Sequence, residues 1–453
     1  MKKLSIYFIL LFAVSTLSCN QQTKENALTD VNEVKYPEKA KNMNIYEVNI
    51  RQYTPEGTIN AFSTHLPRLK KMGVDILWIM PVQPIGVKNR KGPLGSYYSI
   101  QDYTAVNPHF GTIDDFKTMV KQAHDLGMAV ILDWVGNHSS FDHEWTKNTG
   151  YYNTDSLGNI TWPAGTDWTD VADLNYDNAE MQQDMINEMK WWVTETDIDG
   201  FRCDVAGEVP MEFWNNAKDQ LDSLKDLFML AEWDEPRMHD HAFHMTYGWG
   251  PHHWMNETAK GHIDVDSLES LLIGDIDRYG KAPFRMLFTT NHDENSWNGT
   301  VFERFGEGHL AWAVFAFTVR GMPLIYGGQE AGLNKRLRFF DKDTIDFSQL
   351  PYAEFYGKLL ALKHNNEALF NGEYGGDLNF INDGNNEVTT YTRTKDENEV
   401  LVIINLSDKV QEVSYSDAAL VGDYTDYLSG ELFSINPNEK LTLQPYQYHI
   451  VSK

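Results

Sequence analysis

The sequence predicts an α/β protein: a (β/α)8 TIM barrel with a loop-rich insertion after its third strand and a C-terminal antiparallel β-sandwich domain. Two observations support the barrel. Short, nearly continuous apolar segments alternate with amphipathic helical segments from residue 44 onward, which is typical of a parallel sheet covered on both faces. About eight such units occupy residues 44–371, as a closed barrel of this kind requires. A doubly wound open sheet is the alternative.

The order of the apolar segments supports the barrel element by element. A strand is expected over 45–50, an amphipathic helix over 62–72, and a continuous apolar strand over 75–82. A second helix over 114–126 precedes the strand expected over 128–135. The remaining strands are expected over 200–205, 227–233, 244–247, 285–290 and 324–326, and the one near 244–247 has the weakest pattern.

Two regions depart from this alternation. Residues 138–180 are rich in Thr, Asp, Asn, Gly and Trp and lack a long apolar segment, so we expect an inserted subdomain there. Over residues 372–453, short alternating segments separated by turn signals predict the antiparallel domain. Its strands are expected over 387–393, 400–405, 410–415 and 441–451.

The N-terminal residues have the layout of a secretory signal peptide, expected over 1–18. Lys2 and Lys3 precede an apolar run over 4–17 that is too short to span a bilayer comfortably. Leu17-Ser18-Cys19 resembles a bacterial lipobox, which would make Cys19 the lipidated first residue; a plain cleaved signal is the alternative. Residues 19–43 are polar, as in a tether. We therefore expect an exported chain, anchored to the cell envelope on the periplasmic or outer side of an outer membrane.

Charge and cysteine content limit the partners. The formal net charge of −27 repels phosphate backbones and anionic lipid headgroups, so neither nucleic acid nor direct membrane binding is expected beyond the lipid anchor. A neutral substrate suits such a surface. The two cysteines, Cys19 and Cys203, form no disulfide framework once Cys19 is lipidated or removed. Nothing in the sequence indicates an oligomeric state.

Acidic residues occur at or just after the ends of three predicted strands. These residues are Asp204, Glu232 and Asp293. Because the carboxyl ends of barrel strands gather on one face, the three carboxylates are expected to meet there. Glycosidic cleavage needs one carboxylate at the anomeric carbon and one protonated carboxyl that assists the leaving oxygen. Arg202 shares a strand face with Asp204, so its guanidinium is expected to lower the pKa of Asp204 and keep it ionised.

Four segments resemble, in order, the four short signature regions of the α-amylase superfamily, glycoside hydrolase family 13. They are DWVGNH at 133–138, GFRCDVAGE at 200–208, AEWDE at 231–235 and FTTNHDE at 288–294. A segment at 172–175 (ADLN) resembles the further signature in the superfamily's inserted domain, and 95–112 resembles the loop after its second strand. The likeness covers nearly all of the chain from residue 44 onward.

The resemblance implies a retaining hydrolase of α-glucosidic bonds, mainly α-1,4, in starch, glycogen and maltooligosaccharides. It makes Asp204 the nucleophile that forms a covalent glucosyl-enzyme intermediate, Glu232 the general acid and base, and Asp293 the stabiliser of the transition state. It implies substrate-binding roles for Tyr98, Asp102, His138, Arg202 and His292. No cofactor is required for this chemistry.

The resemblance also raises the question of a structural calcium ion. Asn137 and Asp173 match positions that hold calcium in many α-amylases, and oxygen ligands suit that hard cation. The alternative is that both residues only hydrogen-bond the insertion to the barrel. Gly207-Glu208 stand where the superfamily usually has Lys-His, and Ser96 stands where many members have His. The missing Lys usually contacts a sugar on the leaving side, so these departures concern the substrate more than the catalytic set.

Several other functions are alternatives. Within the superfamily these are a cyclodextrin or pullulan hydrolase, an α-1,6-acting enzyme and an α-glucan transglycosylase. A catalytically silent glycan-binding relative would typically lack catalytic carboxylates, whereas all three are present here. A metal-dependent barrel hydrolase would need ligands converging on one point, which these motifs fit less well than a sugar site. Asp204 or Glu232 alone is also compatible with a structural carboxylate paired with an arginine.

Overall fold

The computed structural model describes residues 34–381, 384–437 and 439–452. The chain divides after Val34, and the unit that begins at Lys35 contains both the barrel and the C-terminal domain. The predicted signal peptide, Cys19 and most of the predicted tether lie outside the described residues. Within the described ranges, no helix has both the length and the apolar character needed to cross a membrane.

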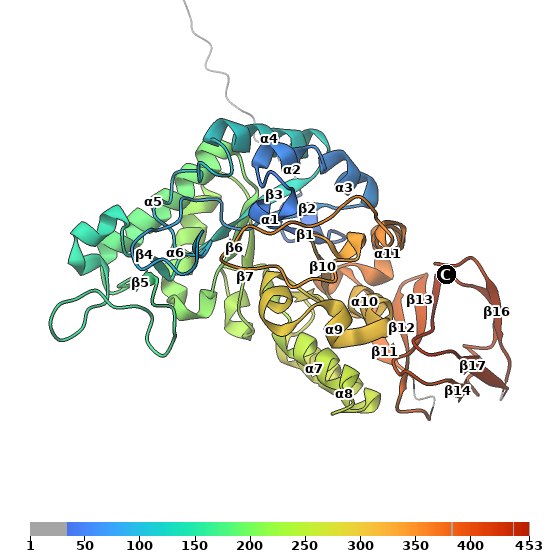
Figure 1. Ribbon diagram of the computed structural model, residues 1–453. Helices are drawn as coiled ribbons and strands as arrows, with labels where there is room; N and C mark the ends of the chain where they lie inside the picture. Colours follow the sequence, from blue (N-terminus) through green and yellow to red (C-terminus); the bar gives the residue numbers. More distant parts are fainter. Residues whose placement is uncertain (1–33, 382–383, 438, 453) are drawn as a thin grey trace, which may run out of the picture. The chain divides into compact units, whose positions relative to one another are not determined.

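Parallel strands close a barrel in the order β1-β10-β9-β8-β7-β6-β3-β2 (Figure 1). Their bounds are β1 (Ile45–Val48), β2 (Ile76–Ile79), β3 (Ala129–Trp134), β6 (Gly200–Cys203), β7 (Phe228–Ala231), β8 (Met245–Tyr247), β9 (Phe284–Leu287) and β10 (Met322–Tyr326). Closure is visible at Ile45 of β1, which pairs with Ile76 of β2 on one side and with Leu324 of β10 on the other. The predicted barrel is therefore confirmed, and the open doubly wound sheet is wrong.

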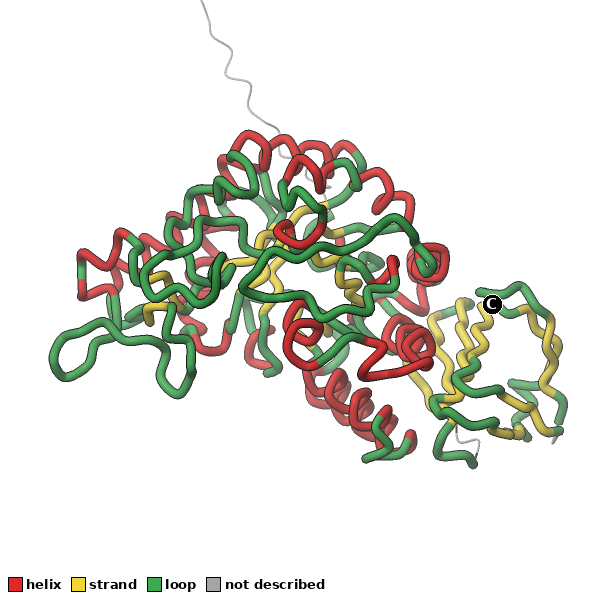
Figure 2. The backbone as a smooth tube through the Cα atoms, viewed as in Figure 1, coloured by secondary structure: helices red, strands yellow, loops and turns green. Residues whose placement is uncertain are grey.

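Helices surround the barrel strands (Figure 2). They are α1 (Ile50–Tyr53), α2 (Ile59–Ser63), α3 (Leu66–Met72), α4 (Ile113–Asp125), α5 (Ala179–Thr196), α6 (Met211–Asp222), α7 (Trp249–Ala259), α8 (Val265–Tyr279), α9 (Val301–Phe305), α10 (His309–Thr318) and α11 (Ala353–Asn365). The helix expected over 62–72 is two helices, α2 and α3. Pro67 lies in the first turn of α3, where its missing N–H leaves no helical hydrogen bond unmade.

The strands are apolar on both faces because each face packs against a different part of the core. In β2, Ile76 and Trp78 point into the barrel interior, whereas Leu77 and Ile79 pack outward against the helix layer. All four side chains are fully buried. This arrangement explains the continuous apolar run that predicted a strand of a covered parallel sheet.

The insertion after β3 has little regular structure. Its strands β4 (His138–Ser140) and β5 (Val171–Asp173) form an antiparallel pair, in which His138 is the partner of Asp173. The pair keeps both ends of the insertion beside the barrel mouth, so that side chains from the loop between them reach the space above the strand ends.

The C-terminal domain is built from antiparallel strands, as predicted. Its main sheet has the order β11-β12-β13-β18, and the pairs β14-β17 and β15-β16 are not hydrogen-bonded to it but share its hydrophobic core. Their bounds are β11 (Asp377–Phe380), β12 (Val388–Lys395), β13 (Asn398–Asn405), β14 (Gln411–Ser414), β15 (Gly422–Thr425), β16 (Leu432–Ile435), β17 (Lys440–Leu443) and β18 (Tyr448–Ser452). The single strand expected over 441–451 is wrong: β17 and β18 are separate, because Pro445 lacks an N–H and Tyr446 adopts a positive φ of 56°.

Candidate active site

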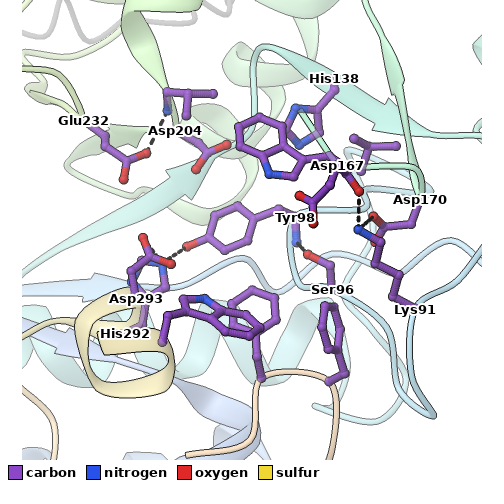
Figure 3. Close-up of a pocket in the computed structure, with 16 residues that line it drawn as sticks. Lys91, Ser96, Tyr98, His138, Asp167, Asp170, Asp204, Glu232, His292 and Asp293 are labelled. Atoms are coloured by element: carbon purple, nitrogen blue, oxygen red, sulfur yellow. Dashed lines mark hydrogen bonds and ion pairs between the residues drawn. The ribbon is translucent and has the colours of Figure 1, made fainter. Parts of the chain in front are cut away.

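A cavity of about 580 Å³ lies at the carboxyl ends of the barrel strands. The loop after β2 contributes Tyr98, the start of β4 contributes His138, and the loop after β9 contributes His292 and Asp293. Asp204 and Glu232 directly follow β6 and β7 (Figure 3). The structure therefore brings together the predicted catalytic residues and three of the predicted substrate-binding residues, from segments far apart in the sequence.

Arg202 lies beneath this cavity and contacts three acidic side chains. It lies fully buried in β6, and its Nη1 donates to Asp204 Oδ1 at 2.9 Å and to Asp133 Oδ1 at 2.8 Å. Its Nη2 lies 2.9 Å from Glu232 Oε1. One guanidinium thus contacts both candidate catalytic carboxyls, which places them close together. Arg202 orients these groups from below and does not line the cavity.

The environments of the two carboxyls separate their pKa values. Burial raises the pKa of Asp204 to about 6, although Arg202 opposes this shift. Burial also raises the pKa of Glu232, and with the negative charges of Asp204 and Asp293 it outweighs Arg202 to give about 8. Arg202 lowers the pKa of Asp204 as expected, but desolvation is the larger effect and the net shift is upward. Near pH 7 the site holds an ionised Asp204 and a protonated Glu232.

His292 is positioned by a buried carboxylate on another strand. Its Nδ1 lies 2.5 Å from Oε1 of Glu47 in β1, and its Nε2 lies 2.7 Å from the Tyr98 hydroxyl. Burial lowers the pKa of an imidazole, but Asp293 and Glu47 together raise that of His292 to about 9. His292 is therefore a cation at neutral pH, and its Nε2–H donates to the Tyr98 hydroxyl.

His138 and Tyr98 complete the wall around the carboxyls. Burial lowers the pKa of His138 to about 4, so this imidazole is neutral at pH 7. The Tyr98 ring stacks on His292 at a centroid distance of 5.6 Å and is nearly parallel to Phe339 at 6.3 Å. A flat ring held in this way offers a surface for the apolar face of a sugar.

The structure does not bring Asp102 to the cavity. Its side chain is exposed, and its Oδ1 accepts hydrogen bonds from the backbone N–H and the hydroxyl of Thr104. This carboxylate terminates a turn in the loop after β2, so the substrate-binding role implied for it is not supported by its position.

Aromatic residues that the sequence reasoning missed form much of the cavity wall. They are Trp168 of the insertion, Trp297 in the helix after Asp293, and Phe339 and Phe340 in the loop after β10. Trp297 is 52% exposed, which is unusual for so large an apolar side chain. The sequence does show two adjacent aromatic residues, Phe339 and Phe340, in a polar loop. It does not show that this loop lies beside the candidate catalytic carboxyls.

Gly207 leaves room for an aromatic ring on the other side of Glu232. It lies in a short helix after β6, and a Cβ at this position would overlap the indole of Trp233. Trp233 borders two further cavities of about 540 Å³ and about 370 Å³, and the smaller one also contacts Glu232. Gly207, which stands where the resembled superfamily usually has Lys, thus accompanies an indole that borders the same cavity as Glu232.

Replacing Gly207 by Ala should destabilise the protein and displace this indole. Overpacking of a tight site costs about 1–3 kcal/mol, so the Tm should fall. Gly274→Ala is the matched control, since no atom lies within 4 Å of its added Cβ, and a helical Gly→Ala change stabilises by up to about 1 kcal/mol. Equal Tm values for the two variants would contradict the contact with Trp233.

Asn137 and Asp173 take part in hydrogen bonds at the start and the end of the insertion. Asn153 Nδ2 donates to Asp173 Oδ2 at 2.7 Å and to the Leu174 carbonyl at 3.2 Å, while Asn137 Nδ2 lies 3.2 Å from His138 Nδ1. Calcium takes about six to eight oxygen ligands, and the Asn153 amide contacts two of the oxygens beside Asp173. In the described part of the chain, no three His, Cys, Asp or Glu side chains are grouped closely enough to hold a metal ion.

Comparison with protein families gives matches over both parts of the chain. The α-amylase catalytic domain matches residues 25–158 and 165–350, and the C-terminal domain of maltogenic amylase matches residues 378–450. An α-amylase of Haloarcula japonica is 27% identical over 417 residues, and the intracellular maltogenic amylase of Bacillus subtilis (strain 168) is 27% identical over 428 residues. Each alignment covers 87% of this chain, but only 59% of the first relative and 68% of the second.

Solved structures show the same arrangement along nearly their whole length. An α-amylase from Lactobacillus plantarum superimposes with a TM-score of 0.82 at 30% identity, covering 91% of this chain and 99% of the other. A maltogenic α-amylase from Thermotoga neapolitana gives the same TM-score and identity, with 91% and 98% of the two chains covered. The likeness includes the barrel, the insertion and the C-terminal domain, since little of either chain is left unmatched.

Proposed function

The chain belongs to the α-amylase family of glycoside hydrolases, and from this premise we propose that it hydrolyses α-1,4-glucosidic bonds in soluble glucans and maltooligosaccharides with retention of configuration. The observation that carries the proposal is the pair Asp204 and Glu232, held by one buried arginine but with their pKa values pushed apart. Two adjacent carboxyls in opposite protonation states are what a retaining mechanism needs.

The proposed reaction has two displacements. Asp204 attacks the anomeric carbon while Glu232 donates its proton to the leaving oxygen, so that the glycosidic bond breaks and a covalent glycosyl ester forms. Glu232, now ionised, takes a proton from water, and the resulting hydroxyl attacks the same carbon and releases Asp204. Asp293 and the His292 cation lie where they can hold hydroxyls of the reacting sugar.

A product time course tests this proposal. Purified protein is incubated with maltoheptaose and with pullulan, and the first products are followed by chromatography and by NMR of the new anomeric centre. Initial release of the α-anomer from maltoheptaose is the expected result. Initial release of the β-anomer would contradict a retaining mechanism, and cleavage of neither glucan would contradict the substrate class.

The pH dependence of kcat/KM should be bell-shaped, with its maximum between the two carboxyl pKa values. Activity should rise as pH increases through about 6, because Asp204 becomes ionised. It should fall as pH increases through about 8, because Glu232 loses the proton that the leaving oxygen needs. Initial rates on maltoheptaose from pH 4 to 10 measure both limbs. A rate that continues to rise above pH 9 would contradict the role of Glu232.

A further inference from the structure

Lys91 joins the loop after β2 to the insertion across one end of the active-site cavity. Its Nζ donates to the carbonyl oxygen of Asp167 at 2.5 Å and lies 3.6 Å from Asp170 Oδ1. Asp170 is buried, so the pair is partly shielded from solvent. These three residues, which we term the Lys91 bridge, line the cavity together with the catalytic carboxyls (Figure 3).

The same loop is also attached to the loop after β10. Leu94 N–H donates to the Phe340 carbonyl at 3.0 Å, and a Cβ at Gly92 would overlap the Phe340 side chain. Arg51, which is 4% exposed, donates from Nη1 to the carbonyls of Gly95 and Phe339 at 3.0 and 3.1 Å. The wall is therefore continuous from the insertion, through the Lys91 bridge, to the loop that carries Phe339 and Phe340.

The wall formed by the Lys91 bridge and the loop with Phe339 and Phe340 lies opposite Glu232, on the other side of the place where the glycosidic bond is cleaved. Figure 3 shows Glu232 and Lys91 on opposite sides of Tyr98. Glu232 protonates the leaving oxygen, so the leaving part of the glucan lies on its side, where Val205 and Trp233 border the two further cavities. The part that becomes bonded to Asp204 extends the other way, toward the wall. In an α-1,4-glucan that part continues to the non-reducing end of the chain.

Resting on the function proposed above, we infer that the enzyme acts from the non-reducing end of its glucan and releases glucose or maltose, because the Lys91 bridge closes the cavity on that side. The cavity of about 580 Å³ must hold the reacting sugar as well as any sugar beyond it. On the side of the leaving part of the glucan, the two further cavities beside Trp233 provide space, so chains of varying length are accepted there. The bridge thus selects chain ends, and Lys91 and Asp170 determine product size.

A substrate with a capped end tests the inference. Maltoheptaose is compared with maltoheptaose whose non-reducing end carries a 4,6-O-ethylidene group, which adds bulk at the sugar that must reach the wall. The wild-type protein should release glucose or maltose first from the free substrate. It should act on the capped substrate at least about 100-fold more slowly, a loss typical of misplaced reacting atoms.

Variants of the bridge should remove this discrimination. Lys91→Ala opens the wall, so the rate on capped substrate should rise about tenfold, and maltotriose or longer products should appear among the first. Asp170→Asn removes the charge with little change in volume and should act in the same direction. Lys88→Ala is the control, because Lys88 is an exposed residue of the same loop with its Nζ 5.9 Å from the Phe141 ring centre; it should match wild type.

The outcomes separate this inference from the proposed function. Equal wild-type rates on free and capped substrate, with products of mixed length, would overturn the inference and leave α-glucan hydrolysis intact. Bridge variants that discriminate as strongly as wild type would overturn the role of Lys91. Cleavage of neither substrate by wild type would overturn both proposals.

Discussion

Asp204→Asn is expected to lower kcat/KM on maltoheptaose by at least about 10⁴-fold, as removal of a covalent nucleophile does in other hydrolases. The amide cannot form the glycosyl ester. Arg202 would keep its contacts with Asp133 and Glu232, so the site should remain folded. Initial rates with a purified variant, and its Tm, measure the two consequences.

Asp102→Asn is the matched control for this substitution, since it makes the same chemical change in the loop after β2. Its carboxylate is exposed and caps Thr104, so kcat/KM should stay close to the wild-type value. A large loss in Asp102→Asn would show that this carboxylate acts on substrate despite its position. Substantial activity in Asp204→Asn would contradict the assignment of the nucleophile.

Glu232→Gln should have the second largest effect, and the effect should depend on the leaving group. Loss of a positioned general acid lowers the rate by about 10²–10⁴-fold when the leaving group is a sugar. Fluoride needs no protonation, so α-maltosyl fluoride should still react with Asp204. Without a base the second displacement is slow, and we expect a burst of fluoride stoichiometric with enzyme, followed by slow turnover.

The pH profile provides an independent readout for the same variant. With Glu232 gone, the fall in activity above pH 8 should disappear, while the rise near pH 6 that reflects Asp204 should remain. A Glu232→Gln profile that keeps both limbs, or equal losses on maltoheptaose and on the fluoride, would assign the acid to a different group.

Much of the fold is predictable because the signals that determine it are local. The apolar runs that form β2, β3 and β7 each lie within one short segment, and their nearly continuous apolar composition predicts burial on both faces. The same holds for Asp204 and Glu232, whose places at strand ends predicted that they would meet. Predicted boundaries were wrong where a local break was overlooked, as at the start of α3, where Pro67 lies in the first turn, and at Pro445 between β17 and β18.

The sequence by itself therefore determined the barrel, its insertion and the candidate carboxyls at the strand ends, because strand periodicity and strand-end positions are properties of short segments. Only the tertiary structure decided the protonation states and the shape of the cavity. Glu47 raises the pKa of His292 from 245 residues away, burial overrides Arg202 at Asp204, and Lys91 meets Asp167 across 76 residues. Desolvation and contact at such separations depend on how distant segments pack, and no local pattern records that packing.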